Sequence, residues 1–456
     1  MRKIISRLIL LLFLFAVLYG VRYAWRAFPI ISGYGAKNLC SCVFVAGREP
    51  QSVIAQELGK FPLNLANFDI NDQDSVVTAS VWGLADKKAI YRRGTGCTLI
   101  SGMTESEVRK QTIVVPHFKP SASDTVLRYD TALSAQWEEQ IRQVVSHAFQ
   151  DTDPDKHKNT RAVVVIQNGK LLYEQYAPDF DKHTPQMGWS MTKSITNALI
   201  GILIKDGKLS LYQPAPIEEW QAEGDARSTV TIDQLLRMSS GLAWEEEYGG
   251  PSTATNMLFK EADMGSYASG FPLAHPPDTK WYYSSGTSNI LSMIIRNSTG
   301  ADYYQFVYKR LLHKIGMSSA VIEPDASGTY VGSSYLYATP LDWAKFGMLY
   351  LNDGVWNGER ILPEGWVRYS STATPGAPQG EYGAHFWLNA GAPGTPETRW
   401  YPDAPTSVYS MNGFEGQRVF IIPSKNAVVV RMGLSKRADF DFNEFLSGVI
   451  SVLPEP

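Results

Sequence analysis

Ser190 and Lys193 stand three residues apart at the start of a strongly helical stretch of this chain. That spacing places both side chains on one face of the first helical turn. A serine hydroxyl becomes a nucleophile when a base removes its proton, and a desolvated, neutral lysine amine can be that base. The S-x-x-K pattern therefore predicts a nucleophilic serine. The alternative is that Ser190 only caps a buried helix and Lys193 lies on the surface.

Apolar residues recur at helical spacing behind this pair, and Gly207 follows as a stop signal. We expect a helix that buries most of its surface. The N-terminus of such a helix offers backbone N–H groups and the positive end of its dipole to a developing oxyanion. The periodic residues are Ile195, Ala198, Leu199, Ile202 and Leu203.

Two later stretches carry further groups that could take part. Tyr283 lies in a Trp-Tyr-Tyr-Ser-Ser-Gly segment ahead of a predicted helix, and its phenol could pass a proton between nucleophile and leaving group. Gly413 and Phe414 enter a late hairpin, where a glycine-led edge strand can bring a backbone N–H to a substrate carbonyl. Read singly, the first stretch fits a core tyrosine and the second fits a glycine-rich strand entry.

Composition narrows the class of protein. The chain has 456 residues, a formal net charge of −3 and 44% hydrophobic residues, which is typical of a globular protein. Because no Lys/Arg block follows the first 26 residues, we expect no nucleic-acid binding. The seven histidines are scattered without ligand-like spacing, so the sequence predicts neither a metal site nor a cofactor.

The N-terminus has the pattern of a membrane-targeting segment. Basic residues flank an uncharged run, Leu8 to Val21, which we interpret as the core of an uncleaved signal anchor spanning residues 1–30. We expect the rest of the chain to be extracytoplasmic. The alternative is a cleaved signal, whose nearest small-x-small site, Gly33-Tyr34-Gly35, lies late.

Residues 31–120 are expected to form a small module and a linker, the linker at 116–123. Strands are predicted at 76–82 and 89–91, around a turn at 85–88. In an oxidising compartment Cys97 could pair with Cys40 or Cys42, leaving one thiol over. No catalytic constellation is visible in this module, so a spacer or docking role is the default.

Residues 121–456 are expected to form one larger domain. Hairpins are predicted at 162–176, around an Asn168-Gly169 turn, and at 417–432, and helices are predicted at 136–149, 341–351 and 440–453. Strands early and late with helices between them indicate an α+β fold, with one antiparallel sheet built from both ends of the domain and a helical lobe inserted in the middle.

In this order the three motifs resemble the serine β-lactamase and penicillin-binding superfamily. Within it the chain is similar to the class C branch and its esterase and 6-aminohexanoate-dimer hydrolase relatives. The resemblance covers roughly residues 134 to 453. Supporting stretches are Thr229–Leu242, Ala338–Gly347 and Gly413–Gln417.

The resemblance implies a role for each motif residue. Ser190 would be the acylated nucleophile, with Lys193 and Tyr283 transferring protons; which of these two is the general base stays open. Tyr282 is the competitor of Tyr283. The N–H groups of Ser190 and Phe414 would form the oxyanion hole beside Gly413.

Two departures from the family pattern bear on the substrate. The late triplet reads Met411-Asn412-Gly413, without the cation and hydroxyl that hold a substrate carboxylate, and Tyr-x-Asn is replaced by a triplet ending in Ser285. We therefore expect a serine hydrolase that takes a small-molecule ester or amide substrate.

Alternatives stay open at this point. One is β-lactamase or penicillin-binding activity, and another is a non-catalytic binding protein or sensor that keeps the fold. In a third, the N-terminal module carries the main function by binding a partner.

Overall fold

The structure, a computed structural model, describes residues 2–118, 127–151, 153, 155–436 and 438–455. They form two compact units. The first comprises residues up to 111 together with 245–263 and 325–327, and the second comprises the rest of the chain. The linker expected at 116–123 lies partly outside the described residues.

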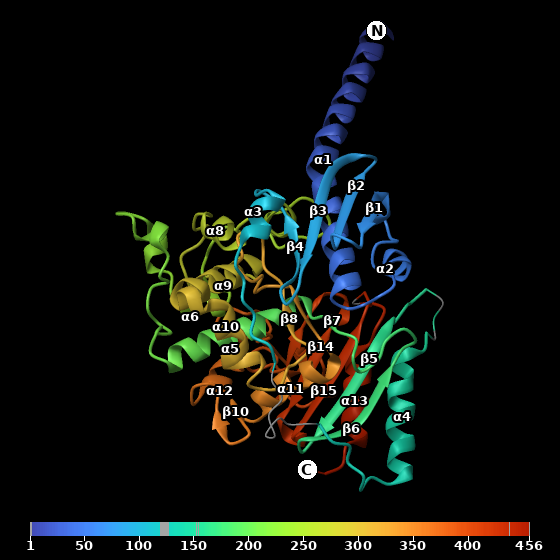
Figure 1. The fold of residues 1–456 in the computed structure, drawn as a ribbon, viewed down its shortest axis with the longest axis vertical. Helices are drawn as coiled ribbons and strands as arrows, with labels where there is room; N and C mark the ends of the chain where they lie inside the picture. Colours follow the sequence, from blue (N-terminus) through green and yellow to red (C-terminus); the bar gives the residue numbers. More distant parts are fainter. Residues whose placement is uncertain (1, 119–126, 152, 154, 437, 456) are drawn as a thin grey trace. The chain divides into compact units, whose positions relative to one another are not determined.

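Helix α1, Arg2–Phe44, runs without interruption from the apolar N-terminal stretch into the core of the first unit (Figure 1). Its length and hydropathy suit a membrane-spanning helix, and continuous burial begins only around Ala27. The helix continues past Gly33 and Gly35, which the sequence did not predict. Both glycines are in close contact with neighbouring segments, since a Cβ on Gly35 would lie 2.5 Å from the Phe68 ring.

A four-stranded antiparallel sheet in the order β1-β2-β3-β4 packs against α1. The turn between β2 and β3 is Trp82-Gly83, so the turn expected at 85–88 is wrong, because those residues belong to β3. A disulfide between Cys40 and Cys97 joins α1 to β4 and leaves Cys42 over. The strands are β1 (Ala66–Asn71), β2 (Val76–Val81), β3 (Leu84–Arg92) and β4 (Gly96–Ile100).

The first unit also takes in two later pieces of chain. Ser101 donates to the carbonyl of Lys260 (2.5 Å), and Gln111 donates to the carbonyl of Ala326 (2.6 Å). The rings of Tyr34 and Phe259 lie 5.5 Å apart. The module is therefore assembled from three stretches of sequence. Its shorter helices are α2 (Pro50–Gln56), α3 (Glu105–Lys110) and α7 (Thr253–Lys260).

The second unit is built on a six-stranded antiparallel sheet in the order β12-β13-β14-β15-β5-β6. Strand β15 pairs with β5, for example Val429 with Val165, so the sheet joins both ends of the domain as predicted. This confirms the expected α+β architecture. The strands are β5 (Thr160–Gln167), β6 (Lys170–Tyr176), β12 (Trp387–Leu388), β13 (Tyr409–Asn412), β14 (Arg418–Ile422) and β15 (Ala427–Gly433).

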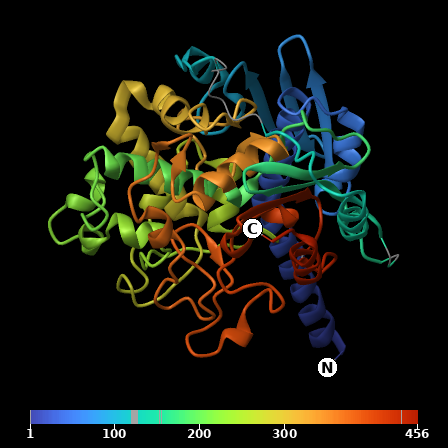
Figure 2. The same cartoon turned by 90° about the horizontal axis from the view of Figure 1, so that it is seen from below.

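Helices cover both faces of this sheet. Helices α4 (Ala135–Phe149) and α13 (Phe442–Val452) bury an apolar core against one face, and α11 (Pro340–Leu351) packs on the other. On that second face Gly347 contacts Val419 and Val428 so closely that a Cβ would lie 2.8 Å from each side chain. In Figure 2 the green and yellow helices gather on the opposite side of the sheet from the teal α4 and the red α13.

The remaining elements build the helical lobe and two small sheets. Its helices are α5 (Thr192–Lys205), α6 (Ile232–Leu236), α8 (Met264–Ser269), α9 (Ser285–Thr299), α10 (Tyr303–Val307) and α12 (Trp366–Ser370). The short strands are β7 (Gln186–Met187), β8 (Val321–Ile322), β9 (Leu336–Ala338), β10 (Val355–Trp356) and β11 (Glu359–Arg360).

Candidate active site

Ser190 lies in a 3₁₀ turn, Trp189–Met191, that leads directly into α5. Trp189 has a φ of 49°, which is uncommon for a residue with a side chain and is a mark of stored backbone strain. The helix is buried from Thr192 to Leu203, as its apolar spacing predicted. The turn thus holds the Ser190 hydroxyl at the end of a rigid, enclosed helix.

Lys193 is 1% exposed, so the alternative of a surface lysine is wrong. Its Nζ lies 3.2 Å from the Ser190 Oγ, 3.0 Å from the Ser285 Oγ and 3.0 Å from the Ser333 carbonyl oxygen. Each of these oxygens can accept a hydrogen bond from the lysine nitrogen. A buried amine in contact with the serine hydroxyl is the arrangement that proton removal from Ser190 requires.

Tyr283, rather than Tyr282, lies beside the lysine. The Lys193 Nζ is 4.9 Å from the centre of the Tyr283 ring, which packs against Trp387 at 5.4 Å and Tyr382 at 5.7 Å. Tyr282 is 38% exposed and its ring faces Lys280. The tyrosine that the motif spacing favoured is therefore the one that the fold brings to the S-x-x-K pair.

The end of β13 lies directly against the nucleophile turn. A Cβ on Gly413 would stand 2.1 Å from the carbonyl oxygen of Gly188, two residues before Ser190. The next residue, Phe414, is 51% exposed, and its ring meets that of Trp189 edge-on at 5.6 Å. Glycine at this position is thus required by close approach, and it places the Phe414 backbone beside the serine turn.

Arginine side chains hold the loop that follows β13. Arg418 donates to the carbonyl of Gly413 at 3.0 Å, and the buried Arg431 donates to that of Gly416 at 3.0 Å. Glu415 has a φ of 59°. A loop with strained backbone stays in one conformation only when surrounding contacts fix it, as these two arginines do here.

A buried histidine that sequence reasoning passed over also contacts the site. The His385 Nδ1 lies 2.8 Å from the Lys193 carbonyl oxygen and its Nε2 lies 3.2 Å from the Ser288 Oγ. A carbonyl only accepts, so Nδ1 carries the proton and Nε2 accepts from the hydroxyl. Burial lowers the pKa of His385 to about 3, so the ring is neutral. An isolated histidine outside any motif gave no signal in the sequence.

The position of His385 links helices α5 and α9. Ser288 follows Ser285 by one turn of α9, and Ser285 accepts from the Lys193 amine. His385 therefore joins the backbone of α5 to α9, the helix that the Lys193 side chain also reaches. His385 itself has a φ of 60°, a conformation that few residues other than glycine, asparagine and aspartate adopt readily.

The site has the groups for acyl transfer. A serine hydroxyl can act as a nucleophile, a lysine amine and a tyrosine phenol can transfer protons, and backbone N–H groups can stabilise an oxyanion, and residues of these types lie together here. Among the residues that the structure describes, no group of three or more His, Cys, Asp or Glu side chains has a metal-binding arrangement.

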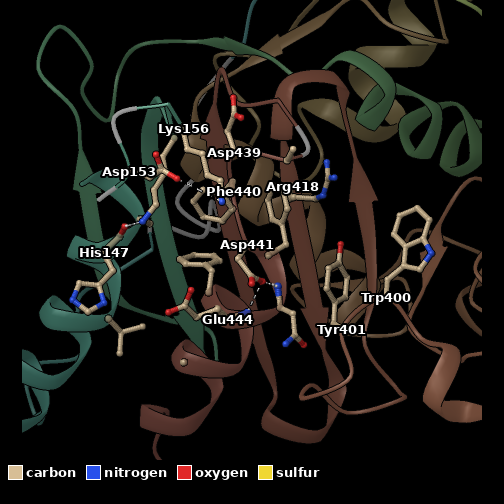
Figure 3. A pocket seen from close by; sticks show the side chains of 18 residues that line it. His147, Asp153, Lys156, Trp400, Tyr401, Arg418, Asp439, Phe440, Asp441 and Glu444 are labelled. Atoms are coloured by element: carbon tan, nitrogen blue, oxygen red, sulfur yellow. Dashed lines mark hydrogen bonds and ion pairs between the residues drawn. The ribbon is translucent and has the colours of Figure 1, made fainter. Parts of the chain in front are cut away.

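A cavity of about 730 Å³ opens elsewhere in the second unit, beside α4, α13 and β14 (Figure 3). Its walls include Trp400, Tyr401, Phe440 and Arg418, and none of the described lining residues is a serine, threonine or cysteine. It also has several side chains of each charge, such as Lys156 and Asp439. Because its described lining has no hydroxyl or thiol nucleophile beside a buried base, the Ser190 cluster is the better candidate for acyl transfer.

Comparison with known proteins finds similar sequences and structures. A family model described as Beta-lactamase matches residues 136–442. The 6-aminohexanoate-dimer hydrolase of Paenarthrobacter ureafaciens is 23% identical over 299 residues, which cover 60% of this chain and 72% of that protein.

Solved structures show the same fold. A Bacillus anthracis protein provisionally named a 6-aminohexanoate-dimer hydrolase superposes with a TM-score of 0.57 at 21% identity, over 75% of this chain and 89% of that one. A penicillin-binding protein homologue from Caulobacter crescentus gives a TM-score of 0.52 at 14% identity, over 71% and 99%. At these identities the likeness is one of fold.

Proposed function

Because the chain belongs to the beta-lactamase family, we propose that it is a serine hydrolase that cleaves carboxylic ester or amide bonds through an acyl-enzyme on Ser190. The observation that carries the proposal is the buried amine of Lys193, 3.2 Å from the Ser190 Oγ. Burial disfavours the charged form of a lysine, and the neutral amine is the form that can take the serine proton.

The proposed reaction has two steps. The Ser190 Oγ attacks the carbonyl carbon while its proton passes to the Lys193–Tyr283 pair, and the N–H groups of Ser190 and Phe414 stabilise the oxyanion. The carbonyl–heteroatom bond then breaks, and the alcohol or amine leaves with a proton. Water, deprotonated by the same pair, attacks the acyl-enzyme and releases the carboxylic acid with Ser190 restored.

The substrate proposal follows from the strand that borders the site. Met411 and Asn412 are both buried, and the Asn412 Oδ1 accepts a hydrogen bond from Ser410. Neither residue supplies the charge that would hold a substrate carboxylate. We therefore favour esters and amides that lack a carboxylate next to the cleaved bond over β-lactams and cell-wall peptides.

The membrane location is part of the proposal. We propose that α1 stays in the membrane as an anchor, with the hydrolase extracytoplasmic. Gly33–Gly35, the nearest small-residue cleavage site, lies within α1 where the helix packs in the first unit, so cleavage there would cut a core element.

The test uses the full chain in detergent, its Ser190→Ala variant and Ser451→Ala, an exposed serine of α13, as the matched control. Each is given p-nitrophenyl esters, linear amides and a chromogenic cephalosporin. We expect ester or amide turnover that Ser190→Ala abolishes and Ser451→Ala leaves intact. Cephalosporin turnover rivalling that of good esters would contradict the substrate proposal.

Covalent labelling distinguishes a serine hydrolase from a non-catalytic binding protein. A fluorophosphonate should label the wild type and Ser451→Ala but not Ser190→Ala. Absence of both turnover and labelling would favour a non-catalytic binding protein that keeps this fold.

A further inference from the structure

The turn between β2 and β3 contains a tryptophan, Trp82, at a position where the turn geometry favours other residues. Trp82 and Gly83 have φ values of 54° and 74°, the pattern of a type I′ hairpin turn, where asparagine, aspartate and glycine are preferred. A bulky residue at positive φ is a backbone outlier, and such outliers concentrate at functional positions. Trp82 is moreover 67% exposed, and Leu84 beside it is 58% exposed.

This turn lies where α1 leaves the first unit. The Trp82 ring meets that of Phe28 edge-on at 5.3 Å, and Ser32 donates to the carbonyl of Ala85 at 2.5 Å. Figure 1 shows the β2–β3 hairpin reaching along α1 toward the N-terminus. The exposed tip is thus continuous with the exposed part of α1.

The level of the tip along α1 follows from helix geometry. A helix rises about 1.5 Å per residue and a bilayer core of about 30 Å takes about 20 residues. A span from Ile4 to Tyr23 fills that length, which leaves Phe28 roughly 7 Å beyond it. Headgroups occupy this layer, where tryptophan and tyrosine are enriched in membrane proteins.

A second loop of the first unit reaches the same level. A Cβ on Gly250 would lie 2.8 Å from the Tyr23 hydroxyl, so the loop ahead of α7 contacts α1 close to the end of the span. Tyr248 in this loop is 46% exposed. Two separate loops of the first unit therefore contact α1 near the depth of the interface, and each loop carries an exposed aromatic side chain.

We propose that the β2–β3 tip, through Trp82 and Leu84, is a second membrane contact that inserts into the headgroup layer of the bilayer that α1 spans. The inference rests on the proposed retention of α1 as an anchor. A helix by itself leaves the first unit free to rotate and tilt about its axis. A tip held in the interface fixes which side of the unit faces the lipid.

The test places an environment-sensitive fluorophore (NBD) on Leu84→Cys in the full chain, reconstituted into phosphatidylcholine–phosphatidylglycerol vesicles. Cys42→Ala removes the remaining thiol. The matched control is Asp72→Cys, in the exposed turn at the opposite end of the same sheet. Val17→Cys on the exposed part of α1 reports whether the anchor is inserted.

Lipids with a nitroxide near the headgroup should quench the Leu84 probe several-fold more strongly than the Asp72 probe. Equal quenching at the two positions, with the Val17 probe quenched by deep nitroxides, overturns the tip contact alone. An unquenched Val17 probe overturns the anchor together with the tip. Ester turnover of the same samples is independent of either result.

Trp82→Asn separates membrane contact from folding, because asparagine is preferred at this turn position. We expect it to keep the thermal midpoint in detergent and to lower quenching of the Leu84 probe. A lower midpoint with unchanged quenching would mean that Trp82 serves the fold through Phe28, and would overturn the proposal.

Discussion

At the scale of single residues, the two contacts of His385, to the Lys193 carbonyl and to the Ser288 hydroxyl, can be tested separately by substitution. Asn at this position presents its amide near the place of the Nδ1–H and tolerates positive φ, whereas Gln reaches toward Ser288 instead. We expect His385→Asn to keep most of the rate of Ser190 acylation. His385→Gln should lose about 10- to 100-fold, because the Lys193 backbone is no longer held in place.

Acylation would be measured with a fluorophosphonate, per folded molecule, beside the thermal midpoint. A purely structural histidine would lower the midpoint in both variants and leave the acylation rate of the folded fraction unchanged. That result would contradict a positioning role for His385.

His385 also predicts a dependence of stability on pH. Its pKa is about 3 in the folded protein, below the ordinary 6.5, so between these values the unfolded chain binds a proton that the native ring excludes. The free energy of unfolding should therefore fall by about 1.4 kcal/mol per pH unit as the pH drops below 6.5, and be insensitive to this group above it. Burial is the main cause of this low pKa, and the neighbouring Lys193 side chain lowers the pKa further.

Urea unfolding between pH 4.5 and 7.5 would measure this slope in wild type and in His385→Asn. In the asparagine variant the pH slope of the free energy of unfolding should be smaller by the amount that one bound proton contributes. Identical slopes in the two proteins would show that His385 is not the titrating group.

Gly413→Ala tests the close approach of the strand to the nucleophile turn. Gly413 has an ordinary φ of −112°, so alanine is not excluded by its backbone, but its Cβ would meet the Gly188 oxygen. Displacing the Phe414 N–H should cost about 100-fold or more in kcat, the scale of losing an oxyanion-hole donor. Gly249→Ala, with no atom within 4 Å of its Cβ, is the control and should retain wild-type turnover.

At the scale of elements, the disulfide joins α1 to the sheet of the first unit across 57 residues of sequence. Replacing both Cys40 and Cys97 by serine should lower the free energy of unfolding of this unit by about 2–4 kcal/mol. Denaturant unfolding under oxidising conditions measures the change. Cys42→Ser, a buried thiol outside the disulfide, controls for loss of a cysteine; an equal loss there would rule out the cross-link as the cause.

The elements also show what the sequence could predict. The helix after Ser190, the hairpin at Asn168-Gly169 and the late hairpin carry strong local periodicity and turn signals, and all three are present. The sequence did not predict the Trp82-Gly83 turn, because tryptophan is uncommon in turns. It did not predict that α1 continues past Gly33 and Gly35, because glycine usually ends a helix.

Long-range contacts explain the other omissions. His385 reaches Lys193 across 192 residues, and Ser333 meets the same lysine from 140 residues away. No local pattern encodes such neighbours. The motif residues were found because each lies in a locally recognisable turn or helix start.

At the scale of the whole molecule, the first unit cannot be removed as an independent cap. Helix α7 belongs to it, although it lies between parts of the hydrolase in sequence. Deleting residues 27–111 would uncover Phe259, which is now buried with its ring 5.5 Å from that of Tyr34. We expect that deletion to aggregate or to unfold at a lower temperature than a chain beginning at Ala27.

Size-exclusion chromatography and thermal unfolding of the two truncated chains would measure the difference. A stable, monomeric chain lacking residues 27–111 would show that α7 does not depend on the module. It would also favour a role for the N-terminal residues in docking alone.

The pairing of β15 with β5 sets the order in which the protein can be completed during synthesis. Strand β5 waits for a partner that leaves the ribosome some 260 residues later, and the first unit waits for residues 325–327. Until then the β5–β6 hairpin presents an unpaired edge, the kind of surface on which chains aggregate.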